Sequence, residues 1–142
     1  VYKIVKNEDN YGILDVGGDD DGAISLASVS KGLDNDQYEM NLVVNTMRPS
    51  TNSVKGIKNM KARIEESSKL KFDNIIANVN LGNDTSIEDI KNGYKIIKKA
   101  AKELKLKIKF ISINKKLLPL DKEINFEEEI FPIDLYMNTP WQ

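Results

Sequence analysis

Short apolar runs alternate with longer helical patterns along this chain. The runs cover residues 11–16 (YGILDV), 40–45 (MNLVVN), 75–78 (IIAN, with Phe72 just ahead) and 108–113 (IKFISI). Each run is rich in Ile, Val or Leu and mostly apolar on both faces, which is typical of strands in a parallel sheet covered by helices. We therefore expect four strands at these positions.

The segments between the runs predict crossover helices over residues 22–33, 52–70 and 86–104. The last is the clearest, because its apolar positions recur three and four residues apart as one stripe: Ile87, Ile90, Tyr94, Ile97, Ala101 and Leu104. Thr85 or Ser86 can cap its first turn. Each gap is long enough to join two parallel strands. The pattern predicts a single α/β domain over residues 1–142, with a mainly parallel sheet and helices on both faces.

The last segment, residues 130–142 (IFPIDLYMNTPWQ), is apolar and lacks a clear period. We expect it to pack on the sheet or the helices, because so much apolar surface is seldom left in water. Trp141 is either a docked anchor or an interface residue.

Composition narrows the chemistry. The chain has no Cys and no His, which excludes thiolate and imidazole catalysis and leaves oxygen ligands for any metal, typical of a hard ion such as Mg²⁺. The absence of Cys is compatible with a cytoplasmic location. No apolar run approaches the ~18–20 residues of a membrane span. With 21 basic and 22 acidic residues the net charge is −1, so no overall field favours nucleic acid.

Lysines cluster around the 86–104 helix and just after it: Lys91, Lys95, Lys98, Lys99, Lys102, Lys105, Lys107, Lys109, Lys115 and Lys116. A solvated helix face is favoured over a nucleic-acid surface, because arginines are few and no aromatic side chain is interleaved for base stacking.

The residues that follow each run are the candidate site, since open parallel sheets bind ligands beyond the carboxyl ends of their strands. Asp15, Gly17 and Gly18 follow the first run. An acid that orients metal-bound water, next to glycines that admit a phosphate, fits a Mg²⁺–nucleotide site. A tight turn with a solvated Asp cap fits these residues equally well. A calcium loop does not fit, because Gly17 and Ser28 would stand where acidic ligands are required.

The other runs are followed by amide and basic residues: Asn45 and Arg48, then Asn78 and Asn80, then Asn114. Residues 11–23 (YGILDVGGDDDGA), 44–49 (VNTMRP), 76–89 (IANVNLGNDTSIED) and 135–141 (LYMNTPW), in this order, resemble the ParA/MinD-like (SIMIBI-class) P-loop ATPases. The resemblance is strongest to a bacterial branch of uncharacterised ATP-binding proteins with DVGGDD, N-x-x-R-P and N-x-N-L-G-x-x-T segments, and it covers nearly the whole chain.

The resemblance implies a three-layer P-loop NTPase fold that binds ATP and Mg²⁺. Asp15 would be the Walker B acid that holds Mg²⁺ through water, and Gly18, beside Gly17, the glycine that senses the terminal phosphate. Asn78, with Asn80, would recognise the base, and Asn114 falls where the last base-side loop begins. The resemblance assigns no role to Asn45 and Arg48, but a basic and amide pair at a strand end fits contact with phosphate or a partner subunit. In such families the nucleotide state governs dimerisation, so a homodimer or a partner protein is implied.

One family motif is missing, because the chain contains no G-x-x-x-x-G-K-[ST] phosphate-binding loop. Relatives carry it upstream, so we expect residues 1–142 to be the C-terminal part of a larger ATPase domain. Without that loop we expect the chain alone neither to bind ATP tightly nor to hydrolyse it. The alternative hypothesis is a non-catalytic, flavodoxin-like α/β binding or scaffold domain.

Overall fold

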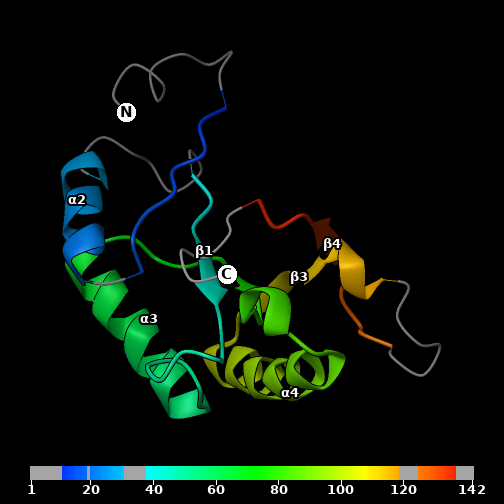
Figure 1. Ribbon diagram of the computed structural model, residues 1–142. Coiled ribbons are helices and arrows are strands. Elements are labelled where there is room, and N and C mark those ends of the chain that lie inside the picture. Colours follow the sequence, from blue (N-terminus) through cyan, green and yellow to red (C-terminus); the bar gives the residue numbers. More distant parts are fainter. Residues whose placement is uncertain (1–10, 19, 31–37, 119–124, 137–142) are drawn as a thin grey trace.

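A computed structural model describes residues 11–18, 20–30, 38–118 and 125–136. Its helices are α2 (Asp20–Ser30), α3 (Val54–Ser68) and α4 (Ile87–Leu104), with short 3-10 turns η1 (Gly82–Asp84) and η2 (Lys115–Leu117). Its strands are β1 (Asn41–Val44), β2 (Asn74–Ala77), β3 (Lys107–Asn114) and β4 (Ile130–Ile133). The strands form one sheet in the order β1-β2-β3-β4, and every neighbouring pair is parallel (Figure 1). The predicted α/β class with a parallel sheet is therefore confirmed.

The sequences of α3 and α4 explain where both helices begin and end. Ser53 caps α3 by accepting from the Gly56 amide, and Ser86 caps α4 within a capping box shared with Asp89. Lys69 and Lys105 end these helices in the left-handed conformation, with φ of 62° and 57°. The apolar stripe predicted for residues 86–104 is confirmed, because Ile90, Ile97 and Ala101 are buried along α4.

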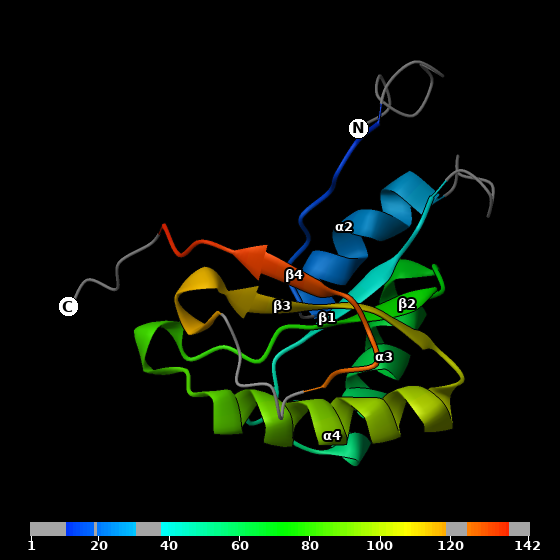
Figure 2. The same cartoon turned by 90° about the vertical axis from the view of Figure 1, so that its right-hand side faces the viewer.

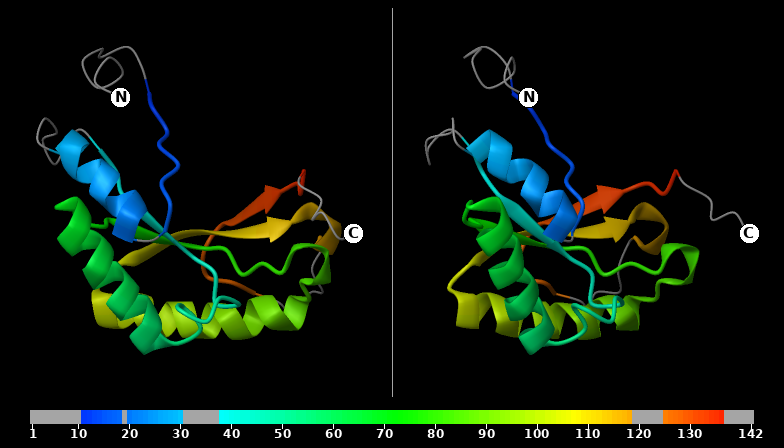
Figure 3. Two further views of the ribbon diagram at one scale, coloured as in Figure 1. Left: turned by 60° about the vertical axis from the view of Figure 1, so that its left-hand side comes forward. Right: turned by 90° about the vertical axis from the view of Figure 1, so that its left-hand side faces the viewer.

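The core lies between the sheet and the layer of α3 and α4. These helices pack against each other on one face of the sheet, and α2 packs against α3 (Figures 2 and 3). Ile75, Ala77 and Ile111 point into this layer and meet Ile57 and Ile97, all fully buried. On the opposite face Val43 is 57% exposed and Phe131 is 51% exposed. The described residues thus form an incomplete version of the three-layer arrangement.

Two expectations about strands differ from the structure. Residues 11–16 form no strand: they pair with none of β1–β4, and Tyr11 and Ile13 are fully exposed. A parallel strand exists through hydrogen bonds to neighbouring strands, and this segment pairs with no strand among the described residues. Conversely, the start of the apolar tail is a strand, β4, which pairs with β3 from Ile111↔Ile130 to Asn114↔Ile133. Pro132 is tolerated there because β4 lies at the edge of the sheet. Trp141 lies outside the described residues.

Candidate functional site

The predicted site residues fall into two groups in the structure. Asn45, Asn78 and Asn80 follow β1 and β2, and Asn114 ends β3, so the topology brings all four to the same edge of the sheet. Asp15, Gly17 and Gly18 lie in the exposed stretch before α2, which belongs to no strand. The structure therefore assembles the amide-bearing half of the predicted site at a strand edge, whereas the acidic and glycine half stands outside the sheet.

Asn45 and Asn80 form a clasp between the loops after β1 and β2. The Asn45 side chain donates to the Asn80 carbonyl oxygen at 2.8 Å. Its Oδ1 accepts from the Met47 amide at 3.0 Å and from the Asn80 amide at 3.2 Å. Thr51 donates to the Asn45 carbonyl oxygen at 2.6 Å. Because both ends of the Asn45 amide are used inside the protein, this side chain shapes the edge of the sheet.

The Asn80 side chain is engaged in the same way within its own loop. Its Oδ1 accepts from the Gly82 amide at 2.6 Å and from the Thr85 hydroxyl at 3.3 Å. Thr85 in turn accepts from the Leu81 amide at 2.7 Å. This network holds η1, where Gly82 has a φ of +66°, immediately before the cap of α4. A left-handed backbone there favours glycine.

Asn78 is held differently. Its backbone amide donates to the Val44 carbonyl oxygen at 2.9 Å, and its Oδ1 accepts from the Ser112 hydroxyl at 2.9 Å. Among the described residues its Nδ2 donates no hydrogen bond. The half-buried Asn78 amide thus keeps a free donor at the edge of the sheet, oriented by Ser112 from the neighbouring strand.

Asn114 and Arg48 complete this edge. Asn114 Oδ1 accepts from the Lys116 amide at 3.0 Å and so caps η2. The next residue, Lys115, forms an ion pair and hydrogen bond with Asp134, which raise the pKa of Lys115 and tie the end of β3 to the end of β4. The Arg48 side chain is exposed and makes no ion pair with the described residues. It is free to meet an anion or a partner.

The Asp15 region has the geometry of a turn. Asp15 and Gly18 are exposed, and a Cβ added at Gly18 would meet nothing within 4 Å. A Cβ at Gly22 would lie only 2.5 Å from the Gly17 carbonyl oxygen, so this loop closes tightly on the first turns of α2. Within the described ranges no group of three or more acidic residues is placed to hold a metal ion. Among the described residues, Asp15 therefore offers a single carboxylate at this position.

Sequence reasoning missed the supporting residues of the edge. Thr51, Thr85 and Ser112 are polar but buried, and each bonds to one of the asparagine loops. The Thr46 hydroxyl is buried and has no hydrogen-bond partner among the described residues. A Cβ added at Gly93 would lie only 2.3 Å from the Thr46 Oγ1 atom. The helix α4 therefore approaches the loop after β1 closely at this glycine. The sequence signal for this close approach was Gly93, because a glycine inside a strongly helical pattern often marks a packing contact.

Comparisons with known proteins identify no relative. A scan against protein-family models gave no match, and searches of curated proteins and of solved structures gave none. The ParA/MinD-like family thus remains a prediction from the motifs. In the part of the chain that the structure describes, every helix is too short or too polar to cross a membrane.

Proposed function

We propose that the chain is part of a nucleotide-dependent switch ATPase of the ParA/MinD type, to which it contributes the Walker B acid and the base-recognition loops. The observation that carries the proposal is the position of Asn78, Asn80 and Asn114 at the carboxyl ends of the adjacent parallel strands β2 and β3. Ligands of open parallel sheets bind at this edge. The order of the four motifs along the chain resembles that of the ParA/MinD-like ATPases, so we expect the ligand to be a nucleotide.

Asn78 is the residue that we assign to the base. Its Oδ1 is engaged by Ser112, and its free Nδ2 can donate to an acceptor on the ring edge of a purine. Asn80 holds the loop, because its own side chain bonds to Gly82 and Thr85. Asn114 would border the base through the start of η2.

The phosphate side of the proposal rests on the resemblance. Asp15 would hold Mg²⁺ through water, and Gly17 and Gly18 would approach the terminal phosphate. Mg²⁺ is usually bound by one or two carboxylates together with phosphate oxygens, so a single aspartate is compatible with such a site when a nucleotide supplies the remaining ligands. Arg48, exposed after β1, would meet phosphate or a partner subunit, and Asn45 would position its loop through the clasp with Asn80.

The proposal requires a phosphate-binding loop from outside residues 1–142. We expect the chain alone to be inactive, and we expect the complete ATPase to act in the cytoplasm as a homodimer or with a partner protein. The first test is to read the coding sequence before Val1. A Gly-rich loop ending in Lys and Ser or Thr, about 70–100 residues earlier, supports the proposal. An in-frame start codon at Val1 contradicts it.

The second test is calorimetry with MgATP, MgGTP and inorganic tripolyphosphate. We expect no micromolar binding to residues 1–142 and clear MgATP binding to the protein extended through the upstream loop. In the extended protein Asn78→Ala should weaken MgATP binding about tenfold or more and leave tripolyphosphate binding unchanged, because only the base contact is lost. Asn59→Ala, on the exposed side of α3, is the matched control. Asp15→Ala should abolish MgATP turnover, and unchanged turnover would exclude Asp15 as the Walker B acid.

A second candidate function is favoured by one observation. Asp15 is exposed, and its loop closes as a turn into α2. This geometry also fits a non-catalytic, flavodoxin-like binding or scaffold domain in which the aspartates only cap a turn. Absence of nucleotide binding by the extended protein would favour this alternative.

A further inference from the structure

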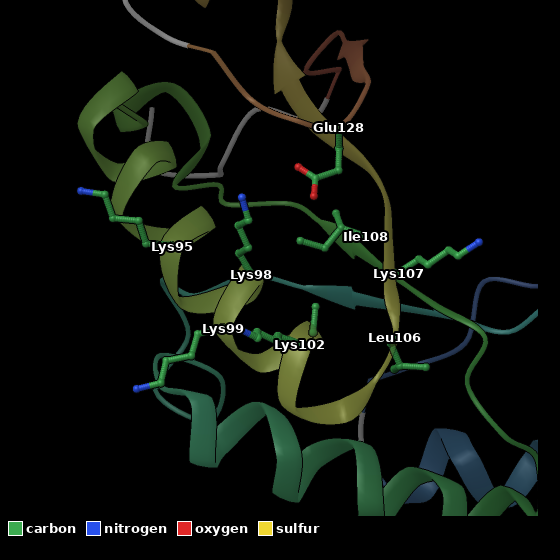
Figure 4. Close-up of a pocket in the computed structure, with 9 residues that line it drawn as sticks. Lys95, Lys98, Lys99, Lys102, Leu106, Lys107, Ile108 and Glu128 are labelled. Carbon is green, nitrogen blue, oxygen red and sulfur yellow. The ribbon is translucent and has the colours of Figure 1, made fainter.

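A lysine-rimmed groove lies far from the asparagine edge. Because α4 runs against the direction of the strands, its second half and the start of β3 stand at the amino ends of the sheet. There an open groove of about 740 Å³ has Lys95, Lys98, Lys99, Lys102 and Lys107 around it (Figure 4). Its apolar lining includes Ala101, Leu106 and Ile108. The groove thus joins a strongly positive rim to an apolar floor.

Part of this positive charge is balanced by nearby carboxylates, because Glu128 lines the groove and the pKa of Glu103 is lowered by Lys58 and by Lys99. Among the described residues Lys95, Lys99, Lys102 and Lys107 make no ion pair, whereas Lys98 pairs with Glu127 at 2.5 Å. The hydrogen bond to Glu127 raises the pKa of Lys98. In Figure 4 Lys95 and Lys99 point outward on one side of the groove and Lys107 points outward on the other, so these lysines flank the groove. An extended ligand along the groove would pass between these ammonium groups.

A segment of the chain itself, just before β4, already packs against the part of α4 next to the groove. The segment before β4 lies on α4, where the Phe126 ring meets the Tyr94 ring edge-on with centroids 4.9 Å apart. Glu128 accepts from the Tyr94 hydroxyl at 2.5 Å and points into the groove, and Glu127 pairs with Lys98. An aromatic side chain followed by carboxylates therefore covers one part of this helix face. The groove continues beyond it along Lys99, Lys102 and Lys107, which make no ion pair with the described residues.

We propose that the groove binds an acidic peptide segment of a partner protein, an extended stretch in which carboxylates flank one or two apolar side chains. The carboxylates pair with Lys99, Lys102 and Lys107, and the apolar side chains cover Leu106 and Ile108. Charge complementarity identifies the partner as acidic, and the apolar floor favours a peptide over a bare polyanion.

Nucleic acid fits this surface less well. The described residues that line the groove include no aromatic ring for base stacking and no arginine, and the nearby Tyr94 ring packs against Phe126. The groove is also independent of the nucleotide proposal, since none of its residues belongs to the asparagine edge.

The test is fluorescence anisotropy with a labelled peptide of sequence EEFEELEE and the chain 1–142. We expect saturable binding that weakens about tenfold between low and high salt, because exposed charge pairs are screened. The double substitution Lys99→Glu/Lys102→Glu should reduce affinity at least tenfold. The matched control Lys55→Glu/Lys116→Glu changes the same charge at exposed lysines elsewhere that make no ion pair with the described residues, and it should retain binding. Circular dichroism checks that both variants are folded.

Two further probes test the floor and the choice of ligand. A peptide with Phe and Leu replaced by Ser should bind several-fold more weakly, and equal binding would overturn the proposed apolar contact. Tighter binding of a single-stranded oligonucleotide, lost in Lys99→Glu/Lys102→Glu, would assign the groove to nucleic acid. No peptide binding, or equal weakening by both double substitutions, would overturn the proposal whether or not the nucleotide proposal holds.

Discussion

Residues 11–16 and β2 have similar sequences, but only β2 forms a buried strand. Both are short apolar runs followed by polar residues. In β2, Ile75 and Ala77 are fully buried between β1, β3 and the helical layer. In the segment 11–16, Tyr11 and Ile13 are fully exposed and the segment pairs with no described strand. Local composition makes both segments competent to be strands, but only neighbours on each side turn one into a buried strand.

The difference also separates the two halves of the candidate site. The residues assigned to the base stand on loops anchored by strands and by the Asn45–Asn80 clasp. The residues assigned to phosphate and Mg²⁺ stand in a segment that pairs with no described strand. Among the described strands β1 also lies at an edge of the sheet, and Val43 on it is largely exposed. A binding site is preorganised only where its supporting elements are paired, so the phosphate half needs partners that the described residues do not supply.

The largest expected effect compares one isoleucine from each region. Ile75→Ala should lower the free energy of unfolding by about 3 kcal/mol, because it opens a cavity in the core. Ile13→Ala should change it by less than about 0.5 kcal/mol, since the side chain already lies in water. Urea denaturation followed by circular dichroism measures both. A comparable loss in Ile13→Ala would show that residues 11–16 are buried in solution.

The clasp gives the next effect. Asn45→Ala removes the acceptor of the Met47 and Asn80 amides, and the free energy of unfolding should fall by about 2 kcal/mol. Hydrogen exchange should speed up at those two amides and stay unchanged in the interior of α3. Asn114→Ala, which frees only the Lys116 amide, should cost less. Equal losses in the two variants would mean that the clasp adds nothing beyond a local turn.

A smaller change in the free energy of unfolding is expected for two glycines, one from each region. Gly93→Ala places a Cβ 2.3 Å from Thr46 Oγ1 and 2.5 Å from a Val79 methyl carbon. The overpacking should outweigh the gain in helix propensity and leave a net loss of about 1 kcal/mol. Gly18→Ala meets nothing within 4 Å and should be nearly neutral. Thermal unfolding of the two variants tests the contrast, and a stabilised Gly93→Ala would contradict the close approach of α4.

Most of the framework could be predicted from the sequence, because it depends on periodicity and capping. The stripe of α4 with its Ser86 cap and the strand runs at 40–45, 75–78 and 108–113 required only local patterns. The strand β4 was missed because Pro132 and its short length obscure the signal. The Asn45–Asn80 clasp joins residues 35 positions apart, so it follows from the sheet and could not be inferred from spacing. Residues 11–16 were predicted wrongly because a strand requires partners that local sequence does not reveal.

The smallest expected effect is the pH dependence of stability that Glu65 of α3 contributes. Burial alone would raise the pKa of Glu65, but hydrogen bonds from Lys61, the Phe72 amide and Lys71 outweigh it and lower the pKa below its ordinary value. A carboxyl group with a lowered folded-state pKa stabilises the protein above its unfolded-state pKa, and this contribution is lost as the pH falls through the folded-state pKa. The urea midpoint should therefore drop between about pH 5 and pH 3. Glu65→Gln should be less stable at neutral pH and show a flatter profile, whereas Glu66→Gln on the exposed side of α3 should follow the unmodified chain. An unchanged slope in Glu65→Gln would mean that these three donors do not favour the ionised carboxylate.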